Sequence, residues 1–168
     1  MKRLNLLPYP RSLSCQPGSY TLPPRAVLHL DAGLPRDTVL LPTAARLQSA
    51  AAGIGVELEV VTGPPAHPRL AMRAIQSTVA PDHAEGYTLI VGAHGITLHY
   101  RQEGGLRAGV ATLRQLLREY GRRLPQLVIR DWPDFERRGV MLDVSRGRVP
   151  SLPTLLDLVG HLADFKVN

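Results

Sequence analysis

The sequence predicts an α+β fold in which two helices cover one face of a mostly antiparallel sheet, followed by one further strand and helix. Three observations carry this prediction. Several short runs alternate apolar and polar residues, two such runs are joined by a Gly-bounded turn, and two longer segments repeat apolar residues at helical spacing. With 168 residues the chain can hold one domain and part of a second. We place the domains at 1–130 and 131–168.

The first part of the chain is rich in short strands. They are predicted at 20–22, 26–30, 56–60 and 70–74. Because the residues of 56–60 and 70–74 alternate with the strand period of two, one face of the sheet is expected to meet solvent. A helix is predicted over 40–51, where apolar residues recur at helical spacing until Gly53 ends the pattern.

The clearest local pattern is a β-hairpin at 87–100, where the turn 92–95 carries glycine at both ends. The next segment, 106–117, has apolar residues at i, i+4, i+7 and i+11 and arginines on the opposite side. This pattern predicts an amphipathic helix that covers the sheet and ends at Gly121. A last strand of this layer is expected at 124–129.

The residues after 130 have a different character. The polar, proline-containing stretch 130–137 is typical of an elbow between domains. Residues 138–144 are almost continuously apolar, which predicts a strand buried on both faces. A helix capped by Ser151 or Thr154 should follow. Its apolar residues are Leu155, Leu158, Val159, Leu162 and Phe165.

Composition excludes several classes of protein. The net charge of +6 comes from arginines spread mostly singly, and aromatic residues make up only 5%, so no nucleic-acid interface is predicted. No apolar run reaches the roughly 18 residues that a membrane span needs. With one cysteine and scattered histidines, neither a disulfide nor a metal or cofactor site is expected. Pro8 and Pro10 interrupt the only signal-like start, which favours a cytoplasmic location.

Polar residues at the end of the predicted strand 138–144 form the candidate site. Parallel β/α folds bind ligands at the carboxyl ends of their strands. The fork of Arg146 could hold two sugar hydroxyls or a carboxylate, or it could simply pair with Asp143 or Asp157. Asp143 could fix Arg146 or be satisfied by Arg138, and a structural role is expected for both Asp143 and Arg138.

A family resemblance rests on these residues. The stretch 130–135, the run from Arg138 to Arg146 and the ending at 166–168 resemble the entry into the catalytic barrel of family 20 glycoside hydrolases, the β-N-acetylhexosaminidases. Residues 7–10, 85–89 and 109–117 are similar, more diffusely, to that family's non-catalytic α+β domain. The resemblance implies that residues 131–168 are a linker and the first β/α unit of a (β/α)8 barrel.

The resemblance also implies an activity. The family removes terminal N-acetylhexosamine residues by substrate-assisted, retaining catalysis, and the residue matching Arg146 holds hydroxyls of that sugar. Gly147-Arg148 departs from the His-Phe that many members carry there. The catalytic Asp-Glu pair of the family lies on a later strand, so no catalytic residue is expected in this chain and the chain alone should be inactive.

Two alternatives stay open. The chain could be a non-catalytic module that binds glycans or a protein, although Trp132 is its single tryptophan. It could also bind nucleic acid, which a steep loss of affinity with salt would reveal. Apolar residues of an unpartnered barrel unit are expected to promote self-association.

Overall fold

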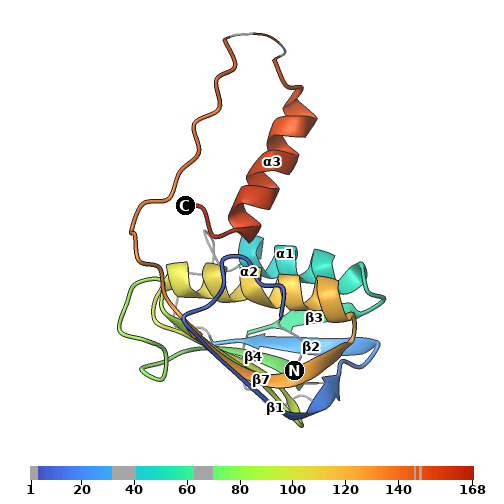
Figure 1. Ribbon diagram of the computed structural model, residues 1–168. Helices are drawn as coiled ribbons and strands as arrows, with labels where there is room; N and C mark the ends of the chain where they lie inside the picture. Colours follow the sequence, from blue (N-terminus) through green and yellow to red (C-terminus); the bar gives the residue numbers. More distant parts are fainter. Residues whose placement is uncertain (1–3, 32–40, 63–69, 146, 148) are drawn as a thin grey trace.

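A mixed sheet forms the base of the molecule, and two helices lie on one side of it (Figure 1). The computed structural model describes residues 4–31, 41–62, 70–145, 147 and 149–168. In this part of the chain the sheet has seven strands in the order β1-β7-β5-β6-β4-β2-β3. The strands are β1 (Ser12–Thr21), β2 (Arg25–Leu30), β3 (Glu57–Val61), β4 (Leu70–Gln76), β5 (Tyr87–Gly92), β6 (Gly95–Tyr100) and β7 (Arg123–Asp131). The helices are α1 (Leu41–Ala52), α2 (Glu103–Tyr120) and α3 (Leu152–Asp164).

The sheet is less antiparallel than the sequence predicted. The β1–β7, β7–β5 and β5–β6 pairs are antiparallel, whereas β6–β4, β4–β2 and β2–β3 are parallel. The predicted hairpin is confirmed, with Tyr87 opposite Tyr100 and Gly92 opposite Gly95. The prediction of a mostly antiparallel sheet was wrong because helix α1 carries the chain back between β2 and β3, so that both strands run in one direction.

The core lies between the sheet and the two predicted helices. Tyr87, Leu89 and Val91 of β5 are buried against this layer, and α2 contributes Leu106 and Leu117. Helix α1 packs beside α2 and against β3. Each fully buried leucine side chain stabilises the fold by about 1.5–3 kcal/mol. The amphipathic patterns at 40–51 and 106–117 therefore predicted the correct layer.

Glycines let α2 approach its neighbours closely. A methyl group at Gly105 would overlap the carbonyl oxygen of Gly86, and one at Gly109 would overlap the side chain of Leu98. The first contact is with main chain, which cannot turn aside as a side chain can. Gly105 and Gly109 thus have a packing role.

The strand expected at 138–144 is absent. These residues lie outside the sheet, and the side chain of Met141 is 96% exposed. A strand needs a neighbour to receive its backbone hydrogen bonds, and none of the described strands pairs with this segment. The chain instead rises away from the sheet and returns through α3 (Figure 1). Helix α3 begins as predicted, with the Ser151 hydroxyl accepting a hydrogen bond from the amide of Thr154 at 3.4 Å.

Candidate functional site

The predicted site residues lie on the exposed segment before α3. The carboxylate of Asp143 accepts hydrogen bonds from the amide of Ser145 at 2.7 Å and from its hydroxyl at 2.5 Å. These two bonds lower the pKa of Asp143 and keep it ionised. Arg146 lies outside the described residues. The geometry therefore leaves the substrate-binding role of Arg146 and the structural role of Asp143 as predictions.

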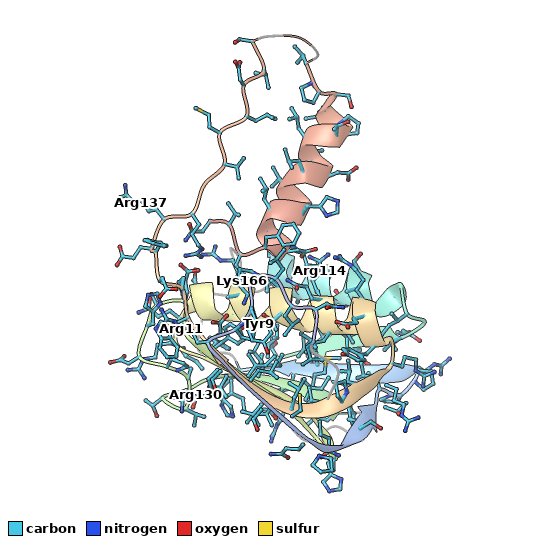
Figure 2. All side chains as sticks on the ribbon, viewed as in Figure 1. Tyr9, Arg11, Arg114, Arg130, Arg137 and Lys166 are labelled. Atoms are coloured by element: carbon cyan, nitrogen blue, oxygen red, sulfur yellow. The ribbon has the colours of Figure 1, made fainter. Side chains whose placement is uncertain are left out.

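Arg138 lies at the other end of this segment and faces the first domain. Its guanidinium forms a two-pronged ion pair with Glu85, with Nη1 donating to Oε1 at 3.1 Å and Nη2 donating to Oε2. Nε donates to the carbonyl oxygen of Lys166 at 2.8 Å. Arg138 therefore joins Glu85 to the end of the chain, and its structural role stays a prediction. Arg137, its neighbour, points away from the body of the molecule (Figure 2).

Asn168 joins the same contact. Its amide donates to the carbonyl oxygen of Arg138 at 3.1 Å, and the amide of Arg138 donates to Asn168 Oδ1 at 2.9 Å. The Nδ2 of Asn168 donates to Glu85 Oε1 at 3.1 Å. Residues 138 and 168 therefore lie side by side against Glu85.

Lys166 enters a buried polar cluster of the first domain (Figure 2). Its Nζ donates to Asp131 Oδ2 at 2.7 Å and to the hydroxyl oxygen of Tyr87 at 3.0 Å. That hydroxyl also donates to Asp131 Oδ2 at 3.1 Å and lies 2.7 Å from Thr112 Oγ1. The Lys166 side chain is 9% exposed and that of Asp131 11%. Lys166 reaches this position with φ +61°, a left-handed conformation that a non-glycine residue adopts at some cost in energy.

Burial shifts the ionisation of this cluster. It lowers the pKa of Lys166, and the negative charge of Asp131 opposes that shift. Burial and the same charge raise the pKa of Tyr87 well above its ordinary value. The hydrogen bonds that Asp131 accepts from Tyr87 and Lys166 join the end of the chain to β5 and β7.

A second ionic cluster fixes the end of α3. The Asp164 carboxylate is bound by Arg46 of α1 at 2.8 Å, by Arg118 of α2 at 3.1 Å and by Arg114 of α2. Gln115 donates to the carbonyl oxygen of Asp164 at 2.9 Å. The Asp164 side chain is only 4% exposed, so it needs these cations. Sequence reasoning missed Asp164, and its one signal was the arginines on the outer side of the 106–117 pattern.

Two cavities border these contacts. One of about 220 Å³ and one of about 180 Å³ both include Glu85, Ala108 and Lys166 in their walls. The smaller is also lined by the rings of Tyr9 and Trp132, and the guanidinium of Arg11 lies 4.6 Å from the centre of the Trp132 ring. The structure thus brings aromatic rings together from positions far apart in the sequence.

The described ranges of the chain contain no group of three or more His, Cys, Asp or Glu side chains arranged to hold a metal ion. None of their helices combines the length and apolar character that a bilayer crossing requires.

Comparison with known proteins gives a family match. The model for domain 2 of glycosyl hydrolase family 20 matches residues 3–132. A β-N-acetylhexosaminidase of Cellulomonas fimi is 33% identical over 91 residues, which are 52% of this chain and 18% of that protein. A β-hexosaminidase of Vibrio furnissii is 39% identical over 84 residues, 49% of this chain and 14% of that protein. The matches thus span less than a fifth of these curated relatives.

Solved structures share the fold. The N-acetyl-β-hexosaminidase of Streptomyces plicatus aligns over 97% of this chain and 33% of its own, with a TM-score of 0.75 and 27% identity. The exo-β-N-acetylglucosaminidase of Vibrio harveyi, solved in complex with N-acetylglucosamine, aligns over 98% of this chain and 24% of its own. Its TM-score is 0.77 at 22% identity.

Proposed function

Because this chain belongs to glycosyl hydrolase family 20 through the domain 2 match at residues 3–132, we propose that it is part of a β-N-acetylhexosaminidase. Residues 1–130 are its non-catalytic domain, and residues 131–168 are the linker and the first β/α unit of its catalytic barrel. The family match is the observation that carries this proposal. The run from Leu142 to Arg146, which resembles the barrel motif of that family, supports it.

The proposed reaction is the hydrolysis of a terminal N-acetylhexosamine. A glutamic acid protonates the leaving glycosidic oxygen while the acetamido oxygen of the substrate attacks the anomeric carbon, oriented by an aspartate. Water then opens the cyclic intermediate, and the configuration is retained. Both carboxylates belong to a later part of the barrel. We therefore propose that residues 1–168 alone do not catalyse this reaction.

Arg146 is proposed to bind the substrate in this reaction. In the proposed barrel, residues 138–144 would form a strand whose carboxyl end opens to the barrel mouth, and the guanidinium of Arg146 would donate to two hydroxyls of the terminal sugar there. Asp143, held ionised by Ser145, is proposed to keep this turn in place. Arg138 is proposed to stabilise the fold and not to contact the substrate.

An Arg146→Ala variant of the longer protein, with residues 1–168 joined to the rest of the barrel, tests this role. Loss of two charge-assisted hydrogen bonds should raise the activation free energy by about 3–6 kcal/mol, at roughly 1.5–3 kcal/mol each. The measurement is kcat/KM on an aryl N-acetylglucosaminide. Arg137→Ala is the matched control, because Arg137 points into solvent (Figure 2), and it should retain wild-type kinetics.

Wild-type kcat/KM in a folded Arg146→Ala variant would overturn the substrate-binding role proposed for Arg146. Turnover by rigorously purified residues 1–168 would overturn the proposal that this part of the protein is inactive alone.

The second candidate function, a glycan-binding module, is favoured by the cavity that Tyr9 and Trp132 line. Calorimetric binding of N-acetylglucosamine oligosaccharides to an inactive 1–168 chain, lost in Trp132→Ala, would support that candidate instead.

A further inference from the structure

Two carboxylates near the ends of sheet strands each hold a cation from residues 137–168. Glu85 lies just before β5 and binds Arg138, while Asp131 ends β7 and binds Lys166. All four side chains are at most 20% exposed. The proposed chemistry uses neither carboxylate, so both need another explanation.

Glu85 contacts both ends of the β/α unit at once. Its Oε1 accepts hydrogen bonds from Arg138 Nη1 and from Asn168 Nδ2, each at 3.1 Å. The main chains of Arg138 and Asn168 are themselves joined by the bond from the Asn168 amide to the Arg138 carbonyl. The Glu85 carboxylate therefore holds Arg138 and Asn168 opposite each other.

Asp131 adds a second fixed point. Its partner Lys166 lies two residues before Asn168, and the carbonyl oxygen of Lys166 accepts from Arg138 Nε at 2.8 Å. A shift of the chain by one residue would remove Lys166 from Asp131 and leave a buried charge without its partner, which is strongly unfavourable. Such a shift would also turn every following strand side chain to the opposite face.

We propose that Glu85 and Asp131 are positioning residues for the catalytic barrel. They fix the start of its first strand, at Arg138, beside the start of its second, at Asn168, in one register. In the proposed barrel Arg146 would follow the strand that starts at Arg138, so this register would determine where its guanidinium meets the sugar. The inference rests on the proposed function. It gives a role to the Glu85-Gly86-Tyr87 motif and to Asp131.

The test uses Glu85→Ala, Glu85→Gln and Asp131→Asn in the longer protein. Each should lower kcat/KM on an aryl N-acetylglucosaminide, by about 10²-fold if Arg146 moves by 1 Å. Glu119→Ala is the matched control. Glu119 is also a first-domain carboxylate that holds a distant segment, because it accepts from the main chain and side chain of Asn5 at 3.3 and 3.4 Å. That variant should retain wild-type kcat/KM.

A second readout separates positioning from general loss of stability. In Glu85→Ala the amide of Asn168 should exchange its hydrogen faster, while the amides of the β5–β6 hairpin exchange as in the wild type. In free energy, the loss of activity in the double variant Glu85→Ala/Arg138→Ala should be less than the sum of the two single losses, because both substitutions remove the same ion pair. If Glu85→Ala fails to fold, Glu85→Gln, which keeps the shape of the side chain, supplies both measurements.

The outcomes are distinct. Wild-type kcat/KM and unchanged Asn168 exchange in folded Glu85 variants would overturn the inference. Equal acceleration of exchange in the hairpin and at Asn168 would also overturn it, because it would show a merely structural role. Absence of hexosaminidase activity in the wild-type longer protein would refute the proposed function and, with it, this role.

Discussion

Two buried tyrosines on neighbouring strands differ in how their hydroxyls are satisfied. The hydroxyl of Tyr87 is bound by Thr112 and Asp131. The hydroxyl of Tyr100 is buried with no hydrogen-bond partner among the described residues. Burial and, to a lesser extent, the charge of Asp31 raise the pKa of Tyr100 to about 12. Among the described residues, Tyr100 therefore stabilises the fold by packing and not by a hydrogen bond of its hydroxyl.

Tyr100→Phe is expected to leave stability at pH 7 unchanged or higher, because it removes a buried hydroxyl without a partner. In the unfolded chain Tyr100 loses its proton near pH 10, whereas in the folded chain it keeps it until about pH 12. Rising pH between these values therefore favours the unfolded wild type. Urea unfolding measures the free energy of unfolding at pH 7 and pH 11. Between these two pH values it should fall less for Tyr100→Phe than for the wild type.

The control for this prediction is Tyr87→Phe. It should be destabilised already at pH 7, by about 1–3 kcal/mol, because Thr112 and Asp131 lose their buried partner. A Tyr100→Phe protein as unstable at pH 7 as Tyr87→Phe would show that the Tyr100 hydroxyl is satisfied after all.

A glycine of α2 and a glycine of α3 differ in how closely other parts of the molecule approach them. On α2, Gly105 lies against the carbonyl of Gly86. On α3, no atom lies within 4 Å of the position that a methyl group at Gly160 would take. The same substitution therefore has opposite consequences on the two helices.

Gly105→Ala should destabilise the fold by about 1–3 kcal/mol, because the new methyl group forces main chain apart. Gly160→Ala should leave the unfolding midpoint unchanged or raise it, since alanine favours a helix by about 0.5–1 kcal/mol over glycine. Thermal unfolding followed by circular dichroism measures both. Equal midpoints for the two variants would argue against a close contact between α2 and the loop at Gly86.

At the scale of the whole molecule, the hydrophobic core ends before the last helix. Its described buried members extend from Leu4 to Ile129, and the one buried residue of α3 is the charged Asp164. Residues after 137 are joined to the first domain mainly by polar contacts, and apolar residues such as Met141 and Leu156 face solvent. This distribution supports the proposed division at residue 130.

Hydrogen exchange on the isolated chain tests the division. The amides of 138–144 should exchange almost without protection, because no described strand pairs with them. Those of the β5–β6 hairpin should be strongly protected. Measurements at low and high concentration also test the predicted self-association, which would protect 138–144 only at high concentration. Protection equal to that of the hairpin in a strict monomer would contradict the proposed division.

The sequence by itself predicted the features that depend on near neighbours. The hairpin at 87–100, the helix at 106–117 and the start of α3 at Ser151 follow from turn glycines, helical spacing and a cap. The family resemblance, which the domain 2 match confirms, likewise rests on short local motifs. Each of these signals lies within a few residues of the element that it specifies.

Tertiary structure alone decided the features that join distant residues. An alternating run does not state the direction of its partner, so the parallel pairing of β2, β3, β4 and β6 could not be predicted. The run 138–144 has the composition of a buried strand, but a strand also needs a partner, and the described chain supplies none. Glu85 meets Arg138 across 53 positions and Asp131 meets Lys166 across 35. Such pairs form because burial in the folded state makes an unpaired charge unfavourable, and no local sequence pattern shows which residues will be buried together.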